Sequence, residues 1–130
     1  MEPGERSRRS TVVVAGDDLL FSDRIAARLA QLGYRPVVVR TADAFHEAVL
    51  HGPAAAILNL ASHRLDALAA IRRAKADSRA RGVPLVGFCG HADEARRAAA
   101  REAGCDLVTT NGAVAARLER LLGSLLSAPL

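Results

Sequence analysis

Five short runs of apolar residues alternate with longer amphipathic stretches along the chain. The apolar runs are mostly continuous and do not alternate polar and apolar positions, and three of them are rich in β-branched residues. This pattern is typical of parallel strands that are covered on both faces of a sheet. We expect strands at residues 11–15, 35–39, 54–60, 84–88 and 107–110.

The stretches that follow the strands repeat apolar residues at helical spacing, and Gly ends several of them. Five helices are therefore predicted. They contain Ile25, Leu29 and Leu32 before Gly33; Ala44, Phe45, Ala48 and Val49 between Thr41 and Gly52; Leu65, Leu68 and Ile71 at the start of the third; residues 92–103 before Gly104; and residues 113–126, with Asn111 as N-cap.

A strand followed by a helix, five times over, predicts a doubly wound α/β fold with a parallel sheet. No repeat or linker interrupts the pattern, so we expect one domain at residues 11–126 between tails at 1–10 and 127–130. We therefore expect no attached output domain. In such folds the functional crevice lies at the carboxyl ends of the strands.

The charge is unevenly distributed. The chain carries a net charge of +4, and residues 64–101 hold nine basic residues against four acidic ones. A basic segment of this kind is typical of a solvated helix face or of a surface that binds nucleic acid. Because the chain has only three Phe and one Tyr, binding of single strands by base stacking is not favoured.

The cysteines and the N-terminal segment indicate the compartment. Cys89 and Cys105 lie in apolar contexts, which favours two buried thiols over a disulfide. The charged segment MEPGERSRRS leads into only the five-residue run TVVVA, which is too short for a signal peptide or a membrane span. We therefore expect a cytoplasmic protein without membrane association.

Three stretches resemble the receiver domain of two-component response regulators. VVVAGDDLLFSDRIAARLAQLGYRPVVVRTADAFHEAV is similar to the first two strands and helices of that family, with an acidic pair after the first strand. PLVGFCGHAD resembles the fourth strand and its loop, and AAREAGCDLVTTNGAV the run into the fifth strand. The resemblance covers about residues 11–126 and implies a flavodoxin-like, five-stranded sheet with strand order 2-1-3-4-5.

In that family the acidic pair holds magnesium, an Asp after the third strand accepts a phosphoryl group, a Ser or Thr after the fourth contacts it, and a Lys after the fifth neutralises it. Asp17 and Asp18 match the acidic pair. The other three positions differ, because Asn59, Cys89 and Asn111 stand where the Asp, the hydroxyl and the Lys are expected.

These three departures point to a degenerate phosphorylation site. The uncharged amide oxygen of Asn59 is a far weaker nucleophile than a carboxylate. Cys89 offers only a weak S–H donor, and Asn111 brings no positive charge to balance a phosphate. We expect Asn59 to form hydrogen bonds with the neighbouring loops instead.

The candidate metal ligands have a simpler interpretation. With the third carboxylate missing, Asp17 and Asp18 are expected to bind Mg²⁺ weakly at most, or to serve only as loop and helix-start residues. His63, Cys89 and His91 include ligand types of a transition-metal site, but they come from separate loops without a zinc-type spacing.

The fifth helix and its neighbours suggest a contact face for a protein partner or a second copy. In receivers the fourth helix, fifth strand and fifth helix often form such a face. Leu122 and Leu126 widen the apolar stripe of the fifth helix, either toward a partner or against the sheet. The other candidate residues of the face are Arg96, Arg97, Arg101, Arg117 and Arg120.

Together these features predict a stand-alone pseudo-receiver: a non-enzymatic module of two-component signal transduction that acts by phosphorylation-independent protein–protein interaction. We expect no cofactor other than weakly bound Mg²⁺. A basic nucleic-acid-associated regulatory protein and a residual metal-binding receiver stay open as alternatives.

Overall fold

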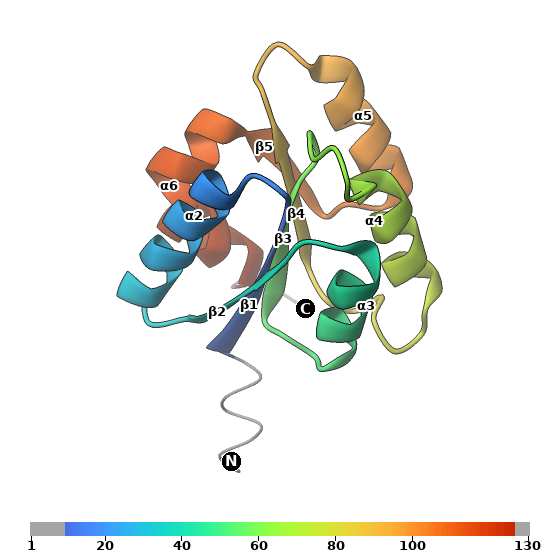
Figure 1. The fold of residues 1–130 in the computed structure, drawn as a ribbon, viewed down its shortest axis with the longest axis horizontal. Helices are drawn as coiled ribbons and strands as arrows, with labels where there is room; N and C mark the ends of the chain where they lie inside the picture. Colours follow the sequence, from blue (N-terminus) through green and yellow to red (C-terminus); the bar gives the residue numbers. More distant parts are fainter. Residues whose placement is uncertain (1–9, 127–130) are drawn as a thin grey trace.

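The computed structural model describes residues 10–126 and contains a five-stranded parallel sheet (Figure 1). Its strands lie in the order β2-β1-β3-β4-β5, and every neighbouring pair is parallel. The predicted fold class and strand order are confirmed. Apart from Ser10, the predicted tails lie outside the described residues. The strands are β1 (Thr11–Ala15), β2 (Arg35–Val39), β3 (Ala55–Asn59), β4 (Leu85–Cys89) and β5 (Leu107–Thr110).

Five helices of the described chain cover the two faces of the sheet. Figure 1 shows α2 and α6 on one face and α3, α4 and α5 on the other. In this part of the chain, no helix is both long enough and apolar enough to cross a membrane. The helices are α2 (Leu19–Gln31), α3 (Ala42–Leu50), α4 (Ala67–Ala76), α5 (Glu94–Ala103) and α6 (Asn111–Leu126).

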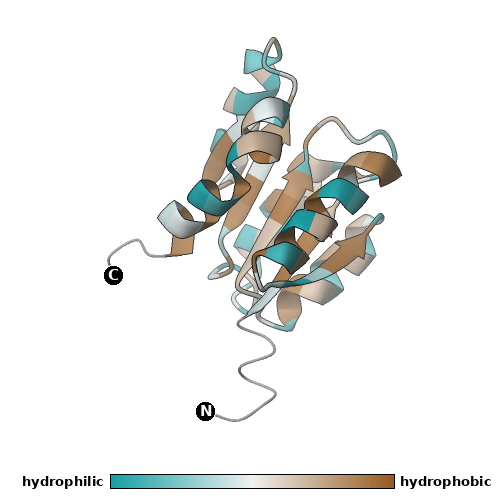
Figure 2. Ribbon diagram, turned by 90° about the vertical axis from the view of Figure 1, so that its left-hand side faces the viewer, coloured by the Kyte–Doolittle hydropathy of each residue, from teal (hydrophilic) through white to brown (hydrophobic). Residues whose placement is uncertain are grey.

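Each face of the sheet has its own apolar core. Along β3, Ala55 and Ile57 pack toward α2 and α6, whereas Ala56 and Leu58 pack toward the other three helices. Successive strand residues point to opposite faces, so a strand that is buried on both sides needs an unbroken apolar run. Figure 2 shows the resulting apolar sheet between helices whose outer sides are polar.

Polar side chains cap most helix N-termini. Thr41 accepts a hydrogen bond from the backbone N of Ala44, as predicted, and Asp66 and Asp93 cap α4 and α5 in the same way. At the other end of α5, Gly104 takes a left-handed backbone conformation with φ +111°, which favours glycine and stops the helix where predicted.

Two predicted helix starts are wrong. The third helix begins at Ala67 and not near Leu65, because Leu65 is a buried loop residue before the cap. Asn111 is not the cap of α6 but its first residue, and the Oγ1 of Thr110 accepts the hydrogen bond from the backbone N of Ala113. Because β5 ends at Thr110, this residue directly precedes the helix, and its side chain can accept a hydrogen bond from one of the free N–H groups of the first turn.

Candidate functional site

The carboxyl ends of the strands border an open cleft of about 840 Å³. It is lined by residues from the exits of β1, β2, β3 and β5. The structure thus brings together four of the predicted site residues, and these are Asp17, Asp18, Asn59 and Asn111. Cys89, the fifth, does not line the cleft.

Asn59 is the last residue of β3 and is half-buried. Its Oδ1 accepts a hydrogen bond from the backbone N of Ala61 at 3.0 Å. A side chain that bonds the backbone two residues ahead turns the chain locally. The predicted hydrogen-bonding role of Asn59 is confirmed, and its amide oxygen is engaged with the loop that follows the strand.

Gly16 is the residue of the β1 exit that packs against Asn59. A Cβ atom at position 16 would lie 3.0 Å from the Cβ of Asn59 and 3.3 Å from the Oγ of Ser62. The two strand exits therefore approach so closely that Asn59 and Ser62 would have to shift by a few tenths of an ångström to admit a side chain at position 16. Gly16 has no side chain and therefore offers no side-chain ligand to a metal ion.

Asp17 joins the loop after β1 to the loop after β3. Its Oδ2 accepts hydrogen bonds from the backbone N of Arg64 at 2.7 Å and of His63 at 2.8 Å. The N–H of Arg64 is the main cause that lowers the pKa of the Asp17 carboxyl below its ordinary value, and the N–H of His63 adds to it. Asp17 thus has a structural role in the loops.

Asp18 serves the start of α2. Its side chain accepts a hydrogen bond from the backbone N of Phe21 at 3.1 Å, which makes it the N-cap of that helix. The prediction that the acidic pair includes loop and helix-start residues is therefore confirmed for both members.

Several side-chain oxygens around the cleft accept hydrogen bonds from the protein backbone. Among the described residues, no three His, Cys, Asp or Glu side chains gather closely enough to hold a metal ion. Asp17 and Asn59 direct oxygens to backbone N–H groups of the loops. Mg²⁺ is usually held by one or two carboxylates and several waters, and both carboxylates that line the cleft, Asp17 and Asp18, accept backbone hydrogen bonds that would compete with a metal ion.

Cys89 lies under α5 and away from the cleft. Its side chain is fully buried, and its Sγ lies 3.6 Å from the carbonyl oxygen of Asp93 and 3.8 Å from the Nη1 of Arg97. Of the three positions that differ from receivers, Asn59 and Asn111 line the cleft and Cys89 does not. The loop after β4 folds over the thiol, because Arg97 binds the carbonyl oxygens of that loop.

Two predicted members of the contact face are not on the surface. Leu122 is only 1% exposed and packs between α6 and the sheet. Arg97 is 8% exposed, and its guanidinium bonds Gly90, His91 and Glu94. Leu122 packs in the core between α6 and the sheet, and Arg97 forms hydrogen bonds to the loop after β4, so neither side chain is available to a partner.

The other members of that face stay accessible to different degrees. Arg96 is half-buried and donates to the carbonyl oxygen of Leu60, whereas Arg101 and Leu126 are exposed. Arg117 and Arg120 are exposed and line a hollow that includes Arg28 of α2. Arg117 and Arg120 therefore lie on the side of α6 that faces α2.

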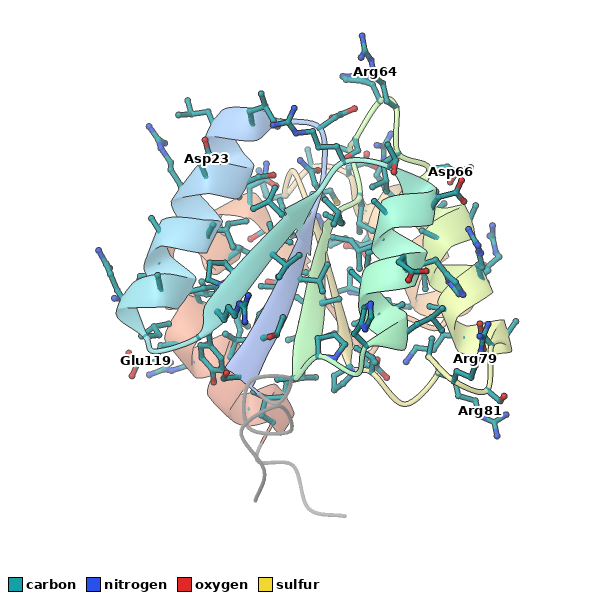
Figure 3. All side chains as sticks on the ribbon, turned by 60° about the horizontal axis from the view of Figure 1, so that its bottom comes forward. Asp23, Arg64, Asp66, Arg79, Arg81 and Glu119 are labelled. Atoms are coloured by element: carbon teal, nitrogen blue, oxygen red, sulfur yellow. The ribbon has the colours of Figure 1, made fainter. Side chains whose placement is uncertain are left out.

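The basic residues of the segment 64–101 do not converge on one surface. Six of the nine form ion pairs, namely Arg73, Lys75, Arg79, Arg96, Arg97 and Arg101. Of the remaining three, Arg64 and Arg81 lie at opposite ends of the molecule (Figure 3). A nucleic-acid surface built from this segment therefore finds no support in the arrangement.

Sequence reasoning missed Arg40, Thr41 and Arg64 as cleft residues. Arg40 and Thr41 directly follow β2, so the rule that strand exits meet at one edge of a parallel sheet would have identified them. No local pattern marks Arg64 as a cleft residue. Its loop is held at the cleft because its backbone N–H donates a hydrogen bond to Asp17, which lies 47 residues earlier in the chain.

No family model matches the chain, and no curated protein matches it either. Solved structures are similar to it. The receiver domain of the sensor histidine kinase PA1611 from Pseudomonas aeruginosa PAO1, which was solved with a magnesium ion coordinated in its active site cleft, is 21% identical with a TM-score of 0.82. The match covers 92% of this chain and 99% of that one.

Two further receiver domains show the same likeness. The receiver domain of NtrX from Brucella abortus is 23% identical with a TM-score of 0.78, over 91% of this chain and 99% of that one. The beryllofluoride-activated NtrC4 receiver domain dimer is 18% identical with a TM-score of 0.71, over 89% and 93% of the two chains. At these identities the likeness concerns the fold, and this chain has the fold of response-regulator receiver domains.

Proposed function

We propose that this chain is a receiver-like signalling module that accepts no phosphoryl group and acts through protein–protein contacts. The observation that carries the proposal is the hydrogen bond from the backbone N of Ala61 to Oδ1 of Asn59 at the end of β3. By the resemblance to receivers, the phosphoryl acceptor is expected at this position. A neutral amide oxygen that already accepts a backbone hydrogen bond is a poor nucleophile.

The surroundings of Asn59 support the same proposal. The resemblance implies a hydroxyl at the end of β4, but Cys89 is fully buried there and does not line the cleft. Asn111 does line the cleft, yet it carries no positive charge to balance the charge that develops on a transferred phosphoryl group. The nucleophile, the hydroxyl and the cation are therefore all replaced.

Incubation with acetyl phosphate and Mg²⁺, followed by intact-mass measurement, tests the proposal. We expect no phosphate adduct on the wild type and very little on Asn59→Asp, which still lacks the hydroxyl and the cation. A receiver domain that carries the Asp, the hydroxyl and the Lys serves as the positive control. A stoichiometric, acid- or base-labile adduct on the wild type would refute the proposal.

The proposed partner contact involves α5, β5 and α6. Arg101 and Leu126 supply an exposed charge and an exposed apolar side chain to this surface, and the contact takes a protein partner or a second copy. In receivers, phosphorylation acts on such a face through a hydroxyl and an aromatic residue. Because Cys89 and the half-buried Val108 occupy those positions, we expect association here to be constitutive.

A further inference from the structure

Figure 1 shows α2 and α6 side by side on the face of the sheet opposite to α3, α4 and α5. Side chains of both helices line a groove between them. Its deeper part is a slot of about 180 Å³ that both helices line. The slot is apolar except for Arg24 and Arg28, which are exposed and therefore form its rim. Its apolar lining residues are Phe21, Ile25, Val114, Ala115 and Leu118.

The walls of the slot are held firmly in place. The ring of Phe21 stacks on that of Phe88 from β4, with 5.1 Å between the centroids and 20° between the planes. Ile25, Val114 and Leu118 are each at most 4% exposed and belong to the core on this face of the sheet. The slot is thus preformed, and its volume suits a single large apolar side chain.

The rim of the groove is strongly positive. A neighbouring hollow of about 570 Å³ on α6 is lined by Arg28, Arg117, Glu119 and Arg120. The two cavities together hold four arginines against one acidic residue. The only ion pair among these residues joins Arg28 to Glu119 at 3.8 Å, with both side chains exposed. Arg24, Arg117 and Arg120 form no ion pair with any described residue, so their charges are available to a ligand.

We propose that the groove between α2 and α6 binds an acidic amphipathic helix of a partner protein, with one apolar side chain of that helix in the slot. Arg24 and Arg28 are one turn apart on α2, so they match carboxylates that are one turn apart on a bound helix. The apolar slot favours a protein over a nucleic-acid duplex, because a duplex presents charged phosphates to the groove and keeps its bases stacked inside; an unstacked base of a single strand is tested below. The test for a phosphate adduct at Asn59 does not depend on Arg24, Arg120 or the slot. The proposed function and this proposal can therefore fail independently.

The binding experiment uses three labelled synthetic peptides and the full chain. The first peptide is an amphipathic helix with Leu on one face and Glu on its flanks; the second has Lys in place of each Glu, and the third has Ala in place of each Leu. We expect saturable binding of the first peptide only, measured by fluorescence anisotropy, and an affinity that falls as salt is added. In NMR spectra, binding should shift the methyl signals of Ile25, Val114 and Leu118.

Two sets of variants test the groove itself. Arg24→Glu/Arg120→Glu should weaken binding at least about tenfold, because attraction becomes repulsion at both ends of the groove. Arg72→Glu/Arg81→Glu is the matched control: it changes the net charge equally at exposed positions on the other side of the sheet. Ala115→Leu, which fills the slot from an exposed helix position without a change of charge, should also weaken binding markedly.

Equal affinities for the Glu and Lys peptides, or equal affinities of the two charge-reversed variants, would overturn the proposal. A single-stranded oligonucleotide is tested in parallel. If it displaces the Glu peptide and its own binding is lost in Arg24→Glu/Arg120→Glu, the groove is a nucleic-acid site and the proposal is wrong.

Discussion

Arg97 donates a hydrogen bond from its Nη1 to the carbonyl oxygen of Gly90 at 2.7 Å. Its Nη2 donates to the carbonyl oxygen of His91 at 2.7 Å and to the carboxylate of Glu94 at 2.8 Å. A buried guanidinium with several acceptors is costly to replace, because its partners lose their donors. The loop after β4 is therefore held to α5 by Arg97, directly above the thiol of Cys89.

Arg97→Met should lower stability and make Cys89 accessible to a thiol reagent. The variant keeps an apolar side chain but removes the donors from two loop carbonyls, so the loop should open more often and uncover the thiol. The measurement is the rate of modification of each cysteine, followed by mass spectrometry of the labelled peptides.

Cys105 is the internal reference for this experiment. Its side chain is 9% exposed, and burial raises the pKa of its thiol to about 11, so it should stay unreactive in both proteins. Arg101→Met, which removes an exposed arginine from the same helix, should leave Cys89 protected. Equal rates for Cys89 in the wild type and in Arg97→Met would contradict the assigned role.

Asp17→Asn should loosen the loop after β3 at neutral pH. The substitution keeps the side-chain shape but removes the negative charge that strengthens the bonds from Arg64 and His63. Amide hydrogen exchange at these two positions should become faster. Asp18→Asn is the control, since Asn also caps helices well and Asp18 does not contact that loop.

The effect of Asp17→Asn should depend on pH. Because the folded state lowers the pKa of Asp17 from its ordinary 3.8, the carboxylate contributes stability above that ordinary value. This contribution is lost as pH falls through the lowered pKa of the folded state. The stability difference between wild type and variant, from urea denaturation, should therefore shrink in acid; a difference that stays constant down to that range would refute the role.

Leu122 and Leu126 should respond differently to truncation. Leu122→Ala removes a fully buried side chain and should cost about 2–5 kcal/mol of unfolding free energy. Leu126→Ala, at a side chain that is 39% exposed, should change it by about 0.5 kcal/mol or less. Chemical denaturation of both variants measures the difference, and similar losses would contradict the placement of Leu122 in the core.

Self-association through α5, β5 and α6 should not depend on phosphorylation. Burial of apolar surface contributes about 25 cal/mol per Å², less the cost of association. Light scattering over a concentration series should show a dimer that acetyl phosphate leaves unchanged and that Leu126→Arg weakens. If the wild type stays monomeric at high micromolar concentration, the prediction of self-association is wrong. Only a contact with a different protein would then remain for this face.

Local patterns in the sequence determined the fold and part of the site. The apolar run at the third strand predicted β3 to within one residue at each end, because a strand covered on both faces needs such a run. Thr41 and Gly104 marked helix ends, since capping and left-handed backbone depend on the residue itself. Asn59 was identified by its place at the end of that strand, and its hydrogen bond to the next loop is also local.

Only the tertiary structure decided which side chains are buried and which distant groups meet. Leu122 and Leu126 both widen the apolar stripe of α6, but only packing against the sheet places Leu122 in the core. In the sequence, Arg97 and Arg101 are equivalent positions of one helix. In the structure, the loop after β4 covers Arg97 and leaves Arg101 exposed. The bond between Asp17 and the N–H of Arg64 joins residues 47 positions apart. Such contacts depend on how strands and loops come together in space, which the spacing of residues along one helix or strand does not record.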